Sequence, residues 1–181
     1  MLKRLLIVVL FSIAFAYIES AVVVYLRVIF HPEGFCFPMV AFDLNPLWRR
    51  LLLTEIGREA ATMAIITTGA WLFGRRSRER WAYALIIFSV WDIFYYIWLK
   101  VLLDWPASVM DWDILFLIPV AWASPVIYPV LVSLAMLAAA VVLLRSEAVH
   151  PMRLDWGNSI AILAGLWDHC AVILSWRLPY D

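Results

Sequence analysis

Long apolar segments that carry isolated acidic residues are the feature that most constrains this chain. The segments are long enough to cross a bilayer, and a backbone that has no water to bond must satisfy itself by folding as a helix. The acidic residues inside them are Glu19, Glu55, Glu59, Asp92 and Asp168, and His169 follows the last of these. An ionisable group at that depth is costly, so it must be paired, bind a ligand or line a wet cavity. These residues therefore mark the place where a functional site is expected.

The composition assigns the chain to the integral membrane proteins. Hydrophobic residues make up 66% of the sequence and charged residues 15%, whereas a soluble domain has about half apolar and about a quarter charged residues. The 14 basic residues balance the 14 acidic ones, so no charge excess points to a nucleic-acid partner. The lipid bilayer is the partner that this composition predicts, and residues 1–181 fit a single bundle-sized domain.

The apolar pattern predicts an all-α fold, a polytopic membrane helical bundle. Five spans are expected, at residues 5–30, 47–73, 81–103, 126–144 and 158–176. Each is close to or longer than the ~20 residues that a crossing requires. Prolines interrupt the segment between the third and fourth spans, so we expect a short interfacial or re-entrant helix over residues 107–118, on the outer side of the membrane.

Basic residues indicate the orientation of the bundle. The short loop at residues 74–80, GRRSRER, carries four arginines, and the loop at residues 145–157 carries Arg145 and Arg153. Short loops rich in lysine and arginine stay in the cytoplasm. With five crossings, this rule predicts an inner-membrane protein whose N-terminus is cytoplasmic and whose C-terminus lies outside.

The buried polar residues are expected to converge on one site. Glu19, Asp92 and the Asp168–His169 pair lie at similar depths in their spans, and Glu55, Arg58 and Glu59 share one face of the second span. We expect Arg58 to pair with a neighbouring carboxylate. If the faces of these helices meet, one polar site lies slightly outside the membrane midplane.

A metal site and a proton path are the two functional interpretations of such a cluster. Carboxylates with one imidazole suit iron, manganese or zinc, and the candidate ligands are Glu19, Glu59, Asp92 and His169. The residues expected to support them are Glu55, Arg58, Tyr96, Lys100 and Asp168. The sequence argues against a bis-histidine haem in this chain, because His169 alone is deep.

Three other interpretations remain open at the level of the sequence. The cluster also fits a structural network of ion pairs, since buried polar groups help to specify membrane bundles. The long outer loops, rich in aromatic residues and proline, could dock other membrane subunits, which would make the chain an accessory subunit of a larger complex, one of redox type included. They could equally shape an entrance for a lipid-like substrate of a membrane-embedded enzyme.

Two stretches of sequence carry a family resemblance. At TEIGREAATM and WDIFYYIWLKVLLDWPASVMDWDILFLIPVAW the chain resembles a family of prokaryotic multi-span integral membrane proteins that has no assigned activity. The resemblance covers mainly the second and third spans and the outer segment that follows them. It implies a shared small-bundle membrane fold, and it implies no activity, cofactor or catalytic residue.

Overall fold

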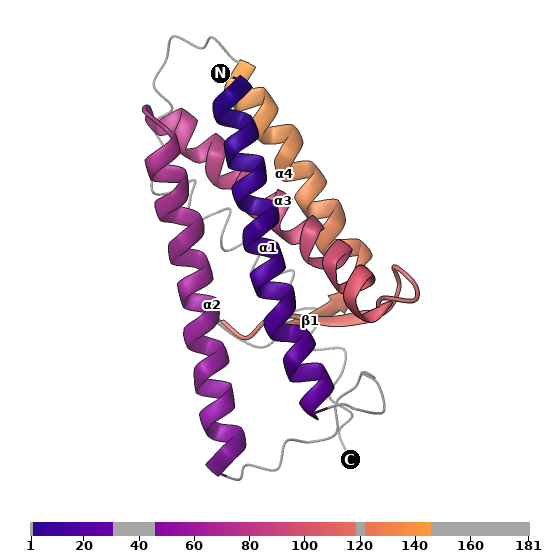
Figure 1. The fold of residues 1–181 in the computed structure, drawn as a ribbon. Coiled ribbons are helices and arrows are strands. Elements are labelled where there is room, and N and C mark those ends of the chain that lie inside the picture. Colours follow the sequence, from indigo (N-terminus) through magenta and orange to yellow (C-terminus); the bar gives the residue numbers. More distant parts are fainter. Residues whose placement is uncertain (1, 31–45, 119–121, 146–181) are drawn as a thin grey trace, which may run out of the picture. The chain divides into compact units, whose positions relative to one another are not determined.

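Four helices and one small sheet form the described part of the protein. The computed structural model describes residues 2–30, 46–118 and 122–145 (Figure 1). In chain order its elements are α1 (Leu2–Phe30), α2 (Pro46–Phe73), α3 (Ser77–Leu103), β1 (Trp112–Phe116), β2 (Trp122–Pro125) and α4 (Ile127–Arg145). The first four predicted spans are thus confirmed as helices. The fifth, at 158–176, lies outside the described residues together with Asp168 and His169.

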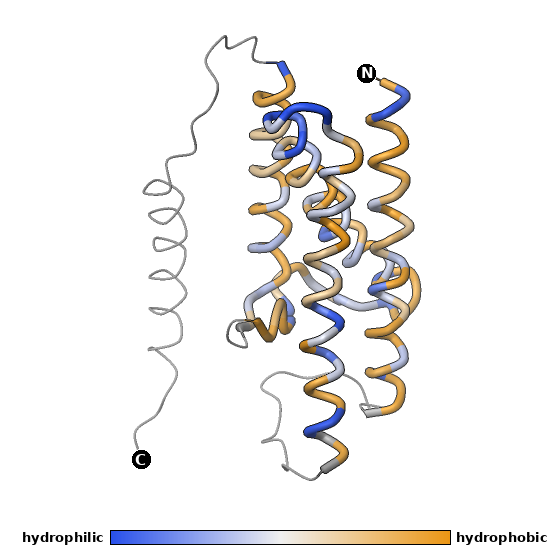
Figure 2. The backbone as a smooth tube through the Cα atoms, turned by 90° about the vertical axis from the view of Figure 1, so that its left-hand side faces the viewer, coloured by the Kyte–Doolittle hydropathy of each residue, from blue (hydrophilic) through white to orange (hydrophobic). Residues whose placement is uncertain are grey.

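Three of these helices, α1, α3 and α4, are long and apolar enough to cross a membrane. Helix α2 has the length, but it fails on composition because its first half carries charged residues. These are Arg49, Arg50, Glu55, Arg58 and Glu59. Figure 2 shows the same contrast, since hydrophilic residues gather in the half of α2 nearest Pro46 whereas α1 is hydrophobic for most of its length. Four of the five expected spans lie in the part of the chain that the structure describes, and three of these four are long and apolar enough to cross a membrane.

The predicted interfacial helix over residues 107–118 is wrong. Turns occupy residues 107–111, and the strand β1 follows and pairs antiparallel with β2, with Asp113 opposite Ser124. Aromatic and β-branched residues favour a strand here, and Pro119 disfavours helical geometry at the residue before it. The fold is thus a mainly helical bundle with a two-stranded hairpin between α3 and α4.

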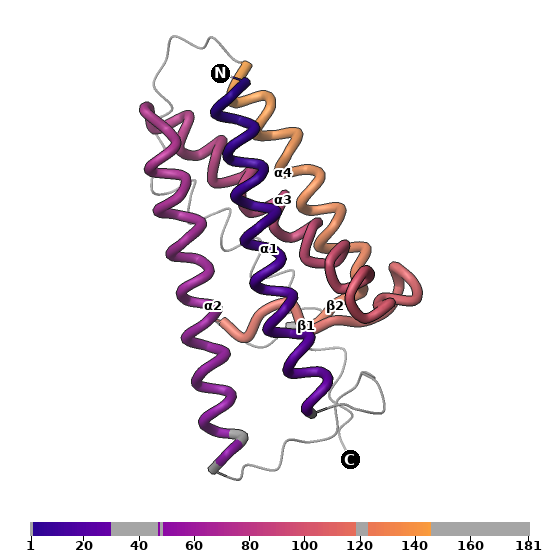
Figure 3. Tube along the Cα trace, in the orientation of Figure 1, coloured from indigo at the N-terminus to yellow at the C-terminus, as the bar shows by residue number. Residues whose placement is uncertain are grey.

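Helix α3 is the centre of the bundle, and it packs against α1, α2 and α4. Phe15 of α1, Ile66 of α2, Ile87 and Trp91 of α3 and Ala140 of α4 belong to one buried apolar cluster. Figure 3 shows that the hairpin does not stay beside the end of α3 but runs back toward the middle of α2. This path brings the hairpin to the charged half of α2.

The connection between α2 and α3 is tight enough to require glycine. A Cβ atom at Gly74 would lie 2.6 Å from the backbone nitrogen of Arg80, a distance that no side chain tolerates. The Arg80 guanidinium donates from Nε to the Gly74 carbonyl at 3.1 Å and lies over the Trp71 ring, 3.7 Å from its centroid. The turn that carries the basic loop is therefore closed by its own side chains.

Candidate functional site

Arg58 joins α2 to α1 through two buried carboxylates. Its Nη2 lies 2.7 Å from Oε2 of Glu55, one turn earlier on α2, and its Nη1 forms an ion pair with Glu19 of α1. Thr62 donates its hydroxyl to Oε2 of Glu19 at 3.2 Å, which gives that carboxylate a second partner from α2. The expectation that Arg58 pairs with a neighbouring carboxylate is confirmed. The pairing also explains how the charged side chains of Glu19 and Glu55 can lie inside the bundle between α1 and α2.

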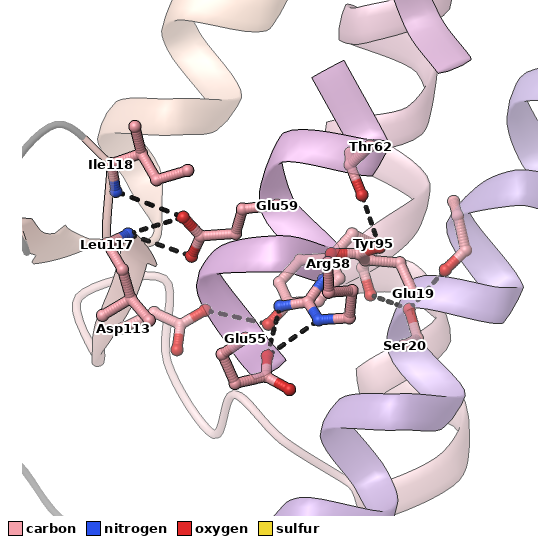
Figure 4. A network of polar contacts seen from close by, with 11 residues as sticks. Glu19, Ser20, Glu55, Arg58, Glu59, Thr62, Tyr95, Asp113, Leu117 and Ile118 are labelled. Carbon is pink, nitrogen blue, oxygen red and sulfur yellow. Dashed lines mark hydrogen bonds and ion pairs between the residues drawn. The ribbon is translucent and has the colours of Figure 1, made fainter. Parts of the chain in front are cut away.

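Glu59 serves a different purpose, because it binds backbone rather than a cation. Both of its carboxylate oxygens lie 2.9 Å from the amide nitrogen of Leu117, and Oε2 also accepts from Ile118 at 3.2 Å (Figure 4). These two amides follow β1, where the chain leaves the strand. Backbone donors at membrane depth need an internal acceptor, and Glu59 supplies one. Glu59 therefore fastens the hairpin to α2.

A second arginine fastens the other part of the hairpin to α1. Nη2 of Arg27 lies 3.0 Å from Oδ1 of Asp113 in β1, and both side chains are almost completely buried. The hydroxyls of Tyr95 and Tyr96 also bond to the Asp113 carboxyl, that of Tyr95 at 3.5 Å to Oδ2. The Arg27 guanidinium stacks over the Trp105 ring, 3.8 Å from its centroid. Asp113 thus receives polar contacts from α1 and α3 together.

Burial and pairing act on Asp113 in opposite directions. Burial raises the pKa of this carboxyl from 3.8 to about 6, while the Arg27 guanidinium and the hydrogen bonds from Ile114, Tyr95 and Tyr96 hold the pKa down. The side chain is therefore mostly ionised at neutral pH and takes up a proton under mildly acidic conditions. Asp113 lies in β1, between the helices that could span a membrane.

Tyr95 connects the two arginine clusters. Its hydroxyl lies between Asp113 and the Arg58 guanidinium in Figure 4, and both arginines interact with it electrostatically. Its backbone carbonyl accepts a hydrogen bond from Ser20 of α1 at 3.2 Å. One connected set of groups, which we call the arginine network, therefore reaches from α2 through α1 and α3 to β1. Its members are Glu19, Arg27, Glu55, Arg58, Tyr95 and Asp113.

Asp92 lies where α3 meets α4, and its hydrogen bond is with Ser133 rather than with a member of this network, although Asp113 acts on it electrostatically. It is 8% exposed, and its Oδ2 accepts a hydrogen bond of 2.8 Å from the hydroxyl of Ser133 on α4. Among residues 2–30, 46–118 and 122–145, no lysine, arginine or histidine lies within ion-pair distance of this carboxylate. Asp92 therefore differs from Glu19, Glu55 and Asp113, each of which has an arginine partner.

The remaining residues of the predicted site divide into three groups. Tyr96 is buried and bonds to Asp113. Lys100 is half-exposed at the end of α3, where it pairs with Asp104 at 2.7 Å and donates to the Pro106 carbonyl, away from the arginine network. Asp168 and His169 lie outside the described residues.

The structure gives the three described candidate ligands separate partners. Glu19 pairs with Arg58, Glu59 binds the hairpin backbone, and Asp92 bonds to Ser133. Within the described ranges, no group of three or more histidine, cysteine, aspartate and glutamate residues is placed to hold a metal ion. Each of these three carboxylates therefore has a partner of its own in the described part of the chain.

The sequence interpretation missed Asp113 as a site residue. Asp113 was assigned to a helix on the outer surface, yet it is an isolated acid in the apolar run Trp112–Phe116. That is the same signal that singled out Asp92. Arg27, near the end of α1, gave no comparable signal, because a long side chain in that place usually reaches outward to the membrane surface.

Comparison with known proteins adds no name to these observations. No protein-family model, no curated protein and no solved structure matches the chain. The chemistry of the buried groups is therefore the basis on which a function can be assigned.

Proposed function

We propose that this is an integral membrane protein that moves protons across the bilayer by binding and releasing them at buried carboxylates. The observation that carries the proposal is a charge imbalance. The carboxylates of Glu19, Glu55, Glu59, Asp92 and Asp113 are buried or half-buried, and the cations among them are Arg27 and Arg58. Uncompensated charge in an interior of low dielectric constant is costly, and an acid in such a place becomes neutral by taking up a proton.

Proton uptake accounts for the separate partners better than metal binding does. A metal ion needs several ligand atoms around one point, whereas these carboxylates are spread over α1, α2, α3 and β1. Hydroxyl groups lie between them, namely Thr62 beside Glu19, Tyr95 and Tyr96 beside Asp113, and Ser133 beside Asp92. A hydroxyl both donates and accepts, so it can pass a proton between neighbouring acids.

The proposal includes an arrangement in the membrane. Helix α2 crosses beside α1, α3 and α4 with its charged face turned toward α1 and the hairpin, and a fifth crossing is formed by residues 158–176. The arginine-rich loop at 74–80 favours a cytoplasmic N-terminus, and the resemblance favours the inner membrane of a prokaryotic cell. In the same proposal the chain belongs with the prokaryotic membrane proteins that it resembles at TEIGREAATM.

Reconstituted protein tests the proposal directly. Purified protein in liposomes that contain a pH-sensitive dye should collapse an imposed pH gradient faster than empty liposomes do. Replacing Glu19 by glutamine and Asp113 by asparagine should slow the collapse by tenfold or more. The matched control is Asp104→Asn, because the Asp104 side chain is 91% exposed at the end of α3. A rate equal to that of empty liposomes at every pH, with protein that is folded and fully incorporated, would overturn the proposal.

A further inference from the structure

The contact between α3 and α4 carries a polar site of its own. Asp92 lies near the middle of α3, and Ser133 reaches it from α4 with a hydrogen bond of 2.8 Å. Ser89 lies three residues before Asp92, and positions i and i+3 of a helix are neighbours on one face. Ser89 and Ser133 are completely buried. We call these three residues the Asp92 site.

Asp92 has the weakest compensation of the buried acids. Glu19 and Glu55 share Arg58, Asp113 has Arg27, and Glu59 receives two backbone N–H groups. One neutral hydroxyl is what the described residues offer Asp92. A carboxylate that accepts a single hydroxyl hydrogen bond in a buried place keeps most of the cost of its charge.

The groups that face Asp92 from the surrounding elements do not lower that cost. Asp113 of β1 acts on it electrostatically with a charge of the same sign. Tyr95 and Tyr96, on α3 itself, are neutral phenols that bond to Asp113. Helix α4 presents Ser133, and its titratable residues, Tyr128 and Arg145, lie near its two ends.

Ser89 supplies the second observation. Its hydroxyl is fully buried and has no hydrogen-bond partner in the part of the chain that the structure describes. Leaving a buried hydroxyl unpaired is costly, so its position three residues from a buried carboxylate calls for an explanation. A protonated Asp92 provides an explanation. The O–H on its Oδ1 can donate a hydrogen bond to the Ser89 hydroxyl oxygen once the Ser89 side chain rotates about χ1. Oδ2 meanwhile keeps its hydrogen bond from Ser133.

We propose that the Asp92 site is where the protein holds its exchangeable proton, as a carboxylic acid clasped between Ser89 and Ser133. The step is the addition of H⁺ to one carboxylate oxygen, with no change of charge elsewhere and no other reactant. A metal cation is a poorer occupant, since hard divalent cations take about six or more oxygen ligands and this site offers one carboxylate and two hydroxyls. The inference rests on the proposed proton-handling function and names the residue that carries it.

Infrared spectroscopy of the full chain in lipid nanodiscs tests the inference without relying on transport. Protein labelled with aspartate carrying ¹³C in its carboxyl group should show a carboxylic acid band that shifts with the label and disappears as the pH is raised. When Asp92→Asn is combined with Asp113→Asn the band should be absent, whereas Asp104→Asn combined with Asp113→Asn should leave it unchanged. Asp113→Asn removes the other buried aspartate as a source, so the band should persist in that variant.

Two serine variants keep the test meaningful if Asp92→Asn does not fold. Ser89→Ala and Ser133→Ala each remove one hydrogen bond to the acid, so each should shift the band and move the titration midpoint, which a merely structural role for Asp92 would not do. A label-sensitive band that survives when Asp92→Asn and Asp113→Asn are combined, or its absence from the wild-type protein at every pH, would overturn the inference. A midpoint that moves when sodium replaces choline at constant ionic strength would also overturn it, in favour of a metal cation.

The outcomes separate this inference from the proposed function. A band assigned to Asp92 in a protein that shows no proton flux in liposomes supports the Asp92 site and overturns the proposed function. Flux that persists in Asp92→Asn supports proton handling and overturns the assignment to Asp92.

Discussion

Removing Arg58 should destabilise the bundle strongly, because it leaves two acids without their cation. In Arg58→Met the chain keeps a long apolar side chain, while Glu19 and Glu55 stay where α1 meets α2 with side chains that are 9% and 18% exposed. Breaking a buried ion pair costs about 3–5 kcal/mol. Arg58 itself is 23% exposed, so water offsets part of this loss and the lower end of the range, about 3 kcal/mol, is expected.

Reversible unfolding in mixed detergent micelles measures this change, with helix content followed by circular dichroism. The matched control is Arg50→Met on the exposed part of the same helix, which should alter the free energy of unfolding by less than about 0.5 kcal/mol. The double variant with Glu19→Gln should be more stable than the sum of the single changes by about 1–2 kcal/mol, since one of the stranded charges is then absent. If Arg58→Met is as stable as the Arg50 control, or if the double variant is additive, the pairing does not hold the helices together.

Three further predictions concern the hairpin and the orientation. Glu59→Gln should speed hydrogen exchange at the Leu117 amide by tenfold or more, measured by mass spectrometry. The reason is that a carboxamide has an N–H donor in place of one of the two carboxylate oxygens that accept hydrogen bonds from the hairpin. Unchanged exchange would contradict the role of Glu59. The folded protein holds the Asp113 proton more tightly than the unfolded chain does, since burial raises this pKa from 3.8 to about 6. The contribution of Asp113 to stability is therefore greatest below pH 3.8 and is lost as the pH rises to about 6, so Asp113→Asn should flatten the unfolding free energy across that window. The orientation can be tested in intact cells with both native cysteines replaced by serine. A membrane-impermeant maleimide should label a cysteine that replaces Ser108 and should not label one that replaces Ser77. The reverse pattern would show that the orientation is the opposite of the one proposed.

The helices could be predicted from the sequence because one signal determined each of them. The apolar runs of α1, α3 and α4 are too long for anything but a helix, and the structure begins and ends them within a few residues of the predicted limits. Strand β1 was beyond that signal, since a run of five residues, four of them apolar, fits a strand and a helix turn equally well. Its partner β2 lies beyond Pro119, and no local pattern indicates that the two segments pair.

For the candidate site, the sequence predicted how far along each helix the polar residues lie, but not the direction in which each side chain points around the helix axis. Equal distances along the helices correctly indicated that Glu19, Glu59 and Asp92 are buried. Depth says nothing about the angle around a helix axis, and Asp92 bonds to α4 while Glu19 bonds to α2. The pairing of Arg58 with Glu55 followed from their spacing on one helix. The bonds from Glu59 to Leu117 and Ile118 had no such signal, because the acceptor is a side chain and the donors are backbone groups that any sequence would carry.

The way the hairpin is fastened has a consequence for biosynthesis. Since a chain is made from its N-terminus, Arg58 meets Glu19 and Glu55 as soon as α2 has emerged. Glu59 must wait for an amide 58 residues further along, and Arg27 for a carboxylate 86 residues further along. In the proposed membrane arrangement, insertion of α1 and α2 thus leaves one acid and one base to be satisfied by water or by the insertion machinery until α3 and the hairpin arrive. In that arrangement, the partners of Glu59 and Arg27 become available to the first two helices only after β1 and the residues that follow it have been synthesised.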